Sequence, residues 1–212
     1  PKKYLNKMFI INPILKKKIY SINKKNKINF DDTKKILIIG GSQGAKFFDE
    51  FVTRVILKVS RQLKIEICQQ VQDKNKNILI EEQYKNHNIK YKLFDFDENL
   101  IENLNNFDLA ITRCGASAIS ELSQLCIPFI AVPFPFAKDN HQFYNAKIYE
   151  EQNCCWIINQ DKTDEENFSS KIIQLFNERN DYLIKKENLE KISNQNSWNI
   201  VNKKLFDLIN EN

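Results

Sequence analysis

Three glycines lie close together after an apolar run, Gly40, Gly41 and Gly44 in "ILIIGGSQGAKFF". Glycine can take positive φ and lets a ligand approach the backbone closely. Ser42 adds a hydroxyl donor, and a helix starting at Ala45 would present unpaired N–H groups and a partial positive charge. Because the whole chain has only 4 glycines, we expect this segment to bind a phosphate group rather than to form a simple turn.

The spacing of these residues differs from the two commonest phosphate-binding signatures. A P-loop has a lysine directly after its last glycine, followed by Ser or Thr, whereas here Ala45 separates Gly44 from Lys46. The dinucleotide-binding motif is broken too, because Ser42 stands where its second glycine belongs. The sequence therefore predicts anion binding by backbone N–H groups and disfavours an NAD-dependent dehydrogenase.

A second loop, "TRCGASAISE", contains the remaining glycine, Gly115, followed by small residues. Glu121 comes about one and a half turns into the predicted helix. A carboxylate there can accept two hydrogen bonds from vicinal hydroxyls, such as those of a ribose. Considered alone, however, Glu121 is better explained by a favourable interaction with the helix dipole, worth about 0.3–1 kcal/mol.

A third loop, "VPFPFAKDNHQFYNA", combines a rigid proline turn with polar side chains. We expect Asp139 to cap the helix that follows. Gln142 and Asn145 are three residues apart, so they share one face of that helix. Their amides suit sugar hydroxyls because each offers donors and an acceptor, although a solvated polar face would look the same.

Apolar runs and helical patterns alternate from residue 35 onward, which is typical of βαβ units and of a parallel sheet with helices on both faces. We therefore predict an α/β fold with a doubly wound, Rossmann-like parallel sheet over residues 34–212. We interpret residues 1–33 as the tail of a preceding domain, with a strand that ends at Asn12-Pro13, plus a linker. The predicted strands cover residues 35–40, 64–71, 89–94, 108–113, 128–133 and 154–159.

The predicted helices follow these strands. Residues 97–107 read as a short helix, Thr163 and Glu166 form a predicted capping box, and residues 181–212 read as helix with a break near residues 193–197. All three polar loops follow strands, so they converge at one sheet edge, where such folds bind ligands. That combination suits a nucleotide diphosphate-sugar better than a dinucleotide.

The composition excludes several classes of protein. The net charge of +5 comes largely from a lysine-rich stretch near the start, which is more often solvated surface than a contact with anionic lipid or nucleic acid. The 5 cysteines and 2 histidines show no metal-binding spacing, and reduced thiols in a cytosolic core are expected. No apolar run reaches the length of a membrane span, and no secretory signal is visible.

The three loops together resemble the C-terminal domain of MurG-type N-acetylglucosaminyltransferases of glycosyltransferase family 28, over nearly the whole chain. The resemblance implies one half of a GT-B architecture, with UDP-N-acetylglucosamine as donor substrate and no cofactor or metal. It implies transfer to lipid I, giving lipid II for peptidoglycan synthesis, and thereby roles in cell shape and division. It places the lipid-linked acceptor on an N-terminal domain absent from this chain, in peripheral contact with the cytoplasmic face of the bacterial inner membrane. Nucleic acid is not an expected partner.

The resemblance also assigns residues to parts of the donor. The diphosphate falls at Gly41, Ser42 and Gly44, and the sugar at Gln142 and Asn145. The uracil and ribose fall at Phe96, Asp97, Ala116, Ser117, Ala118, Ile119, Ser120 and Glu121.

Further positions bear on ligand contacts and on catalysis. His141 occupies a position that is often histidine in the family. Leu15 stands where the family has a ligand-contacting arginine, so that contact is lost or taken by Lys16. No residue of the chain is assigned to catalysis, because the family's general base is expected on the other domain. Asp139 and His141 are fallback bases.

Three alternatives stay open at this point. The first is a related lipid glycosyltransferase of the same fold, such as a diacylglycerol glucosyltransferase. The second is the donor subunit of a transferase whose acceptor half is a separate protein. The third, from another class, is a nucleotide-binding module without catalytic activity.

Overall fold

The computed structural model describes residues 13–24, 29–41, 46–95, 97, 100 and 104–210. These residues form a six-stranded parallel sheet with the order β3-β2-β1-β4-β5-β6, which confirms the predicted doubly wound fold. The strand order reverses between β1 and β4, and ligands of such folds bind beside this switch point. The strands are β1 (Lys34–Ile39), β2 (Ile65–Gln70), β3 (Lys90–Phe94), β4 (Leu109–Thr112), β5 (Phe129–Ala131) and β6 (Cys155–Ile157).

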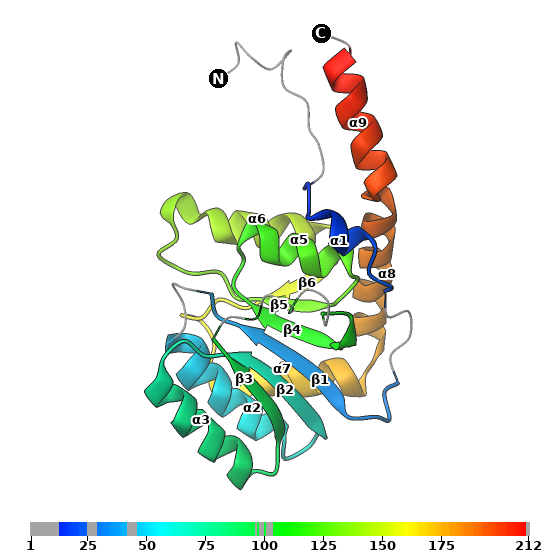
Figure 1. Ribbon diagram of the computed structural model, residues 1–212. Helices are drawn as coiled ribbons and strands as arrows, with labels where there is room; N and C mark the ends of the chain where they lie inside the picture. The colour runs from blue at the N-terminus through cyan, green and yellow to red at the C-terminus, as the bar shows by residue number, and fades with distance from the viewer. Residues whose placement is uncertain are drawn as a thin grey trace.

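Helices cover both faces of the sheet (Figure 1). One face carries α2, α3 and α7, and the other carries α1, α5 and α6, with α8 at the side. The longer helices are α2 (Thr53–Val59), α3 (Lys74–Asn86), α5 (Ala116–Gln124), α6 (His141–Glu151), α7 (Glu165–Asn177), α8 (Asn180–Gln195) and α9 (Trp198–Asn210). The shorter ones are α1 (Lys17–Tyr20), the π-helical η2 (Phe47–Val52) and the 3₁₀ segments η3 (Leu104–Asn106) and η4 (Lys138–Asn140).

Strand β1 shows why there is a separate hydrophobic core on each face of the sheet, beneath each layer of helices. Ile36 and Ile38 pack into the cluster beneath α2 and α7, whereas Leu37 packs into the cluster beneath α5. Successive side chains of a strand point to opposite faces, so a continuous apolar run serves two cores at once. All three side chains are fully buried.

The predicted apolar stripe after the glycine loop is confirmed, with one irregularity. Phe48, Val52 and Ile56 are fully buried, as the spacing of a helix requires. The first part of this helix is π-helical, however, from Phe47 to Val52, before the α-helical geometry of α2. A π-helical stretch is rare and is often found at functional sites, and nothing in the sequence pattern predicted it.

Two predicted helix starts are wrong. The first turn of α7 is capped by Asp164, whose carboxylate accepts a hydrogen bond from the Asn167 backbone N–H at 2.7 Å, so Thr163 lies outside the cap. Asp139 does not cap α6, because its backbone is left-handed, with φ of 52°, inside η4. Asn140, also left-handed, precedes the helix without a side-chain cap.

Several other predictions concern the ends of the chain. The break near residues 193–197 is confirmed, because α8 ends at Gln195 and α9 begins at Trp198. Upstream of Lys34, Leu15 and Ile19 are buried and join the core beneath α5. Leu15, the departure from the family pattern, is thus a packing residue.

Some predicted elements fall partly outside the described residues. The strand expected to end at Asn12 lies there, as does part of the helix expected over residues 97–107, within which η3 is described.

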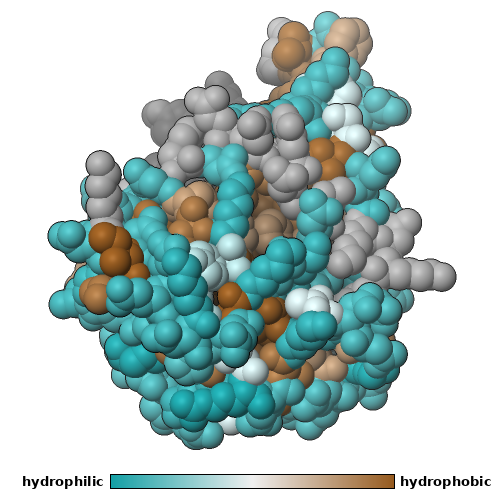
Figure 2. Space-filling model, turned by 60° about the horizontal axis from the view of Figure 1, so that its bottom comes forward, coloured by the Kyte–Doolittle hydropathy of each residue, from teal (hydrophilic) through white to brown (hydrophobic). Residues whose placement is uncertain are grey.

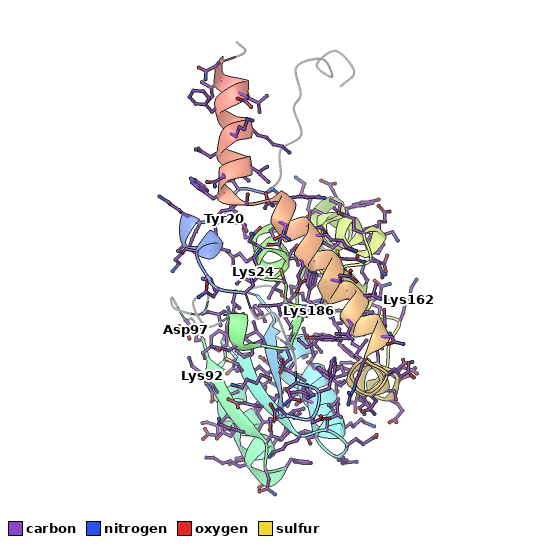
Figure 3. The ribbon with its side chains drawn as sticks, turned by 90° about the vertical axis from the view of Figure 1, so that its right-hand side faces the viewer. Tyr20, Lys24, Lys92, Asp97, Lys162 and Lys186 are labelled. Carbon is purple, nitrogen blue, oxygen red and sulfur yellow. The ribbon has the colours of Figure 1, made fainter. Side chains whose placement is uncertain are left out.

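The surface seen in Figure 2 is mostly hydrophilic, and its apolar side chains form small separate patches. In the described part of the chain, no helix combines the length and the hydropathy that crossing a membrane requires. Helix α9 extends away from the body of the domain (Figure 1). Its first residue, Trp198, packs against the ring of Tyr20 with 5.6 Å between centroids, close to the end of α1 (Figure 3).

Candidate functional site

The loops after β1 and β3 are joined through Gln70, at the end of β2. The backbone N–H of Gly41 donates to the Gln70 amide oxygen at 3.1 Å, and the Gln70 amide nitrogen donates to the Asp95 carbonyl at 3.1 Å. Gln70 therefore holds the start of the glycine loop in place. Sequence reasoning missed this role, although a polar residue at the end of a buried strand was a visible signal.

The glycine loop itself is described only up to Gly41. This residue has φ of +62°, a conformation that favours glycine, and an added Cβ would meet no described atom within 4 Å. None of the described atoms would therefore block a group that approaches this backbone. The predicted phosphate-binding residues Ser42 and Gly44, and the predicted uracil contact Phe96, lie outside the described residues.

Asp97 lies beside the end of β3, where its carboxylate forms an ion pair with Lys92 at 2.7 Å (Figure 3). The Asp97 side chain is only 16% exposed, whereas that of Lys92 is 61% exposed. Lys92 therefore compensates a carboxylate that is mostly enclosed. This pairing orients Asp97 at the sheet edge where the resemblance expects the base of the nucleotide.

At the start of α5, backbone N–H groups have no hydrogen-bond partner among the described residues. Gly115 precedes the helix and has no side chain that could cap it, and the first intrahelical bond here runs from the Ile119 N–H to the Gly115 carbonyl. The N–H groups of Ala116, Ser117 and Ala118 thus have no partner within the helix. A Cβ at Gly115 would meet no described atom within 4 Å, so a ligand can approach this helix end.

Helix α5 separates the predicted nucleotide-binding residues onto different faces. Ala116, Ile119 and Ser120 line a cavity between α5 and α6. Glu121 does not line this cavity and lies instead within the electrostatic influence of Lys16 and Lys18. Ser117 is exposed and Ala118 is half-buried. One ligand group cannot contact all of these residues along one helix face.

Glu121 is a half-buried carboxylate that makes no hydrogen bond with any described residue. Burial raises its pKa above the usual range, and the positive charges of Lys16 and Lys18 oppose that rise. Glu121 is the sixth residue of α5, so it lies beyond the first turn. The helix dipole stabilises a carboxylate only within that first turn. The geometry therefore weakens the purely structural explanation that the sequence favoured.

Gln142 and Asn145 are brought together around the backbone of Cys114. The Gln142 amide oxygen accepts from the N–H groups of Cys114 at 3.2 Å and Phe134 at 3.1 Å. The Asn145 amide nitrogen donates to the Cys114 carbonyl at 3.1 Å. Among the described residues nothing else bonds to these two amides, so Gln142 retains a free donor and Asn145 a free acceptor.

The two fallback bases lie close together in the chain but differ in setting. The His141 Nδ1 atom is 2.8 Å from the Lys138 carbonyl, and the side chain is exposed. Asp139 is exposed in the strained η4 turn. In the described ranges, no group of three or more His, Cys, Asp or Glu side chains could hold a metal ion.

Arg113 organises this edge, and sequence reasoning missed it. Its guanidinium donates to the carbonyls of Val132 and Pro133, both at 3.1 Å, and to the Gln160 amide oxygen at 2.8 Å. Three aromatic rings surround it, with centroid distances of 5.6, 5.0 and 5.3 Å to Phe47, Phe48 and Phe134 respectively. Burial lowers the Arg113 pKa to about 10, so it stays charged at neutral pH.

The family model of the glycosyltransferase family 28 C-terminal domain matches residues 35–199, which include the glycine loop and both later loops. The chain belongs to this family. The family 28 domain is 39% identical to a Pelagibacter ubique protein named UDP-N-acetylglucosamine--N-acetylmuramyl-(pentapeptide) pyrophosphoryl-undecaprenol N-acetylglucosamine transferase, over 100% of this chain and 59% of that relative. A Rickettsia bellii protein of the same name is 38% identical, over 80% of this chain and 49% of its own.

Solved structures support the fold. The crystal structure of Acinetobacter baumannii MurG matches 98% of the family 28 domain and 58% of its own chain, with a TM-score of 0.76 and 22% identity. A single-residue variant of Os79 from O. sativa, in complex with UDP, matches with a TM-score of 0.71 and 12% identity, over 99% and 52% of the two chains. The family 28 domain thus spans somewhat more than half the length of these two proteins.

Proposed function

We propose that this family 28 domain binds UDP-N-acetylglucosamine and is the donor half of a hexosyltransferase that transfers N-acetylglucosamine to lipid I, giving lipid II for peptidoglycan synthesis. The relatives' names state this donor and a lipid-linked acceptor. The observation that carries the proposal is the half-buried Glu121 carboxylate, which accepts no hydrogen bond from a described residue, on the helix α5 whose start no described atom blocks.

The donor would lie across the carboxyl ends of the strands. Its diphosphate fits the backbone donors that follow Gly41 and those that begin α5, with Ser42 and Gly44 completing the loop. Its ribose hydroxyls fit Glu121, and its sugar fits the remaining donor of Gln142 and acceptor of Asn145. No cofactor is needed for this binding. Lys16, near Glu121, is a further candidate contact.

The reaction that we propose is an inverting transfer. An acceptor hydroxyl oxygen bonds to the anomeric carbon while the bond from that carbon to the diphosphate oxygen breaks, and the hydroxyl proton passes to a base. The domain's task is to stabilise the charge that grows on the leaving UDP, which preorganised N–H donors do well. We place the base and the acceptor site on another domain, so residues 1–212 by themselves should bind donor without appreciable transfer.

The same relationship leads us to propose a peripheral position at the cytoplasmic face of the bacterial inner membrane, where the lipid-linked acceptor is reached. The related lipid glycosyltransferases and the non-catalytic module are less favoured, because the curated relatives share one printed activity. A donor subunit of a split transferase would use the same site.

Calorimetric titration tests the donor. We expect UDP and UDP-N-acetylglucosamine to bind, UDP-glucose to bind more weakly than UDP-N-acetylglucosamine, and NAD and ATP to bind far more weakly. Equal affinity for all five ligands, or no binding of UDP, would refute the proposal.

A further inference from the structure

A hollow of 340 Å³ lies at the carboxyl edge of the sheet, beside η2 and the start of α2. Its other wall is formed by Arg113, Phe134 and Gln160, which follow β4, β5 and β6. The volume falls within the range of small-molecule sites, about 300–1,000 Å³. None of the described residues that line this hollow is among those assigned to the donor, so it is a separate place on the same edge.

The positive charge of Arg113 has no carboxylate partner among the described residues. Its guanidinium donates only to neutral groups, the carbonyls of Val132 and Pro133 and the amide of Gln160. Asp161 attracts this charge without forming an ion pair. Arg113 is 6% exposed and lines the hollow, and one N–H of its Nη2 atom has no described acceptor. A buried charge without a counter-ion is unfavourable, so an anion held in the hollow would stabilise it.

The ammonium group of Lys46 brings a second positive charge to this hollow. Lys46 is exposed, and it makes no hydrogen bond or ion pair with a described residue. The other charged lining residues are already paired, because Arg54 bonds to Glu165 at 2.6 Å and Glu50 forms an ion pair with Lys76. The lining therefore has an excess of positive charge that no described carboxylate neutralises.

Aromatic rings supply the apolar part of the lining. The rings of Phe47 and Phe51 stack with 4.7 Å between centroids and an angle of 18° between their planes. The Phe134 ring lies 5.3 Å from the Arg113 guanidinium carbon. All three rings are half-buried, so each keeps surface that a ligand could cover. An apolar group bound against them would leave water while a charged end met the cations.

We propose that this hollow is an anion site, separate from the donor site, for a phosphate group carried on an apolar body. The phosphate would accept hydrogen bonds from Lys46 and Arg113, since ammonium and guanidinium groups both bind phosphate well. The apolar body would lie against Phe47 and Phe51. A lipid-linked phosphate and a soluble aryl phosphate share this chemistry. The inference does not depend on the proposed donor function.

Titration with phenyl phosphate, followed by amide chemical shifts in NMR, tests the site. We expect shifts that centre on Lys46, Phe51 and Phe134, with the same affinity when UDP is present in excess. Phenol lacks the charge and should bind at least about tenfold more weakly. Inorganic phosphate lacks the ring and should bind roughly two- to tenfold more weakly.

Several outcomes would overturn the inference: no binding, equal binding of phenol and phenyl phosphate, or shifts that centre instead on Gly41 and Ala116. The position of the shifts is informative even if UDP does not bind, so failure of the proposed donor site would be seen separately.

Lys46→Met removes one charge at nearly constant length and should weaken phenyl phosphate at least about tenfold. Lys46→Arg should keep most of the affinity. Lys64→Met, at an exposed position just before β2 and so at the other end of the sheet, is the matched control and should have no effect. Unchanged affinity in Lys46→Met would refute the site. Geranyl phosphate distinguishes the two sources, because tighter binding than phenyl phosphate assigns the site to lipid-linked phosphates, and weaker binding assigns it to soluble aryl esters.

Discussion

The amide oxygen of Gln142 accepts a hydrogen bond from the backbone N–H of Cys114 at 3.2 Å, and the Cys114 carbonyl accepts one from Asn145. One peptide segment after β4 therefore fixes which end of each amide faces outward. Amide side chains that were free in solution could turn either end to a ligand. In this domain the fold decides which end of the Gln142 and Asn145 amides faces a ligand, and substitutions can test that orientation.

Gln142→Glu should change sugar recognition without changing the fold. The new carboxylate can still accept from the Cys114 and Phe134 N–H groups, but the outward-facing donor is lost. We expect UDP affinity to stay the same and UDP-N-acetylglucosamine to bind roughly two- to tenfold more weakly, the effect of one neutral hydrogen bond. Calorimetry with both ligands measures the ratio. A parallel loss for UDP would show that Gln142 acts on the whole site rather than on the sugar.

Glu121→Ala should weaken UDP binding by about 1.5–3 kcal/mol, the range for hydrogen bonds to a charged group. That is roughly a tenfold to more than hundredfold rise in Kd. The domain should not lose stability, because burial of an unpaired carboxylate is unfavourable in the free protein. Glu151→Ala, at an exposed position in α6, is the matched control and should leave Kd unchanged.

A ligand without ribose hydroxyls gives an independent check on Glu121. 2′,3′-Dideoxy-UDP should bind the parent chain weakly and be little affected by Glu121→Ala, since the groups that Glu121 would hold are already gone. If the substitution weakens the binding of UDP and of its dideoxy analogue equally, Glu121 does not contact the ribose.

Asp49→Asn should stabilise the domain at neutral pH. Burial raises the Asp49 pKa from 3.8 to about 6, and its Oδ1 atom has no hydrogen-bond partner among the described residues. The folded state therefore holds this proton more tightly than the unfolded state, so Asp49 makes stability fall as pH rises from about 4 to 6. With allowance for solvent screening, we expect a gain of about 1–2 kcal/mol at neutral pH.

Urea unfolding of Asp49→Asn at about pH 4 and pH 7.5 measures this effect. The gain should be present at the higher pH and vanish at the lower one, because there the folded protein holds Asp49 protonated and neutral, like the asparagine of the variant. Asp207→Asn in α9 is exposed and should show no gain at either pH. An equal gain for Asp49→Asn at both pH values would exclude a titration effect.

Arg113→Lys should destabilise the domain although the positive charge is retained. A lysine cannot reproduce the planar fork that reaches Val132, Pro133 and Gln160 together, and the buried carbonyls would lose partners. We expect a loss of about 2–4 kcal/mol in the free energy of unfolding. Arg61→Lys at an exposed position should cost almost nothing. Equal stability of the two variants would mean that the Arg113 hydrogen bonds contribute little.

The strand positions and the doubly wound order were predictable because an apolar run such as residues 36–38 is buried on both faces only in a parallel sheet that helices cover on both sides. Helix starts were harder. Asp164 and Thr163 are both good capping residues one position apart, and which of them meets the free N–H of Asn167 depends on the path of the preceding loop. The sequence pattern around Asp139 suits a cap equally well, but the η4 turn places it in left-handed backbone.

The sequence by itself determined the family, the layer architecture and the residue types at the strand ends, because these follow from local periodicity and from motifs that are continuous in the chain. Only the tertiary structure decided what each polar group is free to do. Arg113 donates to backbone carbonyls of another loop, and Gln142 accepts from backbone N–H groups of another loop. Glu121, by contrast, makes no hydrogen bond with a described residue. Hydrogen bonding depends on distances and angles between segments that are far apart in the chain, and those are set when the sheet brings its strand ends together.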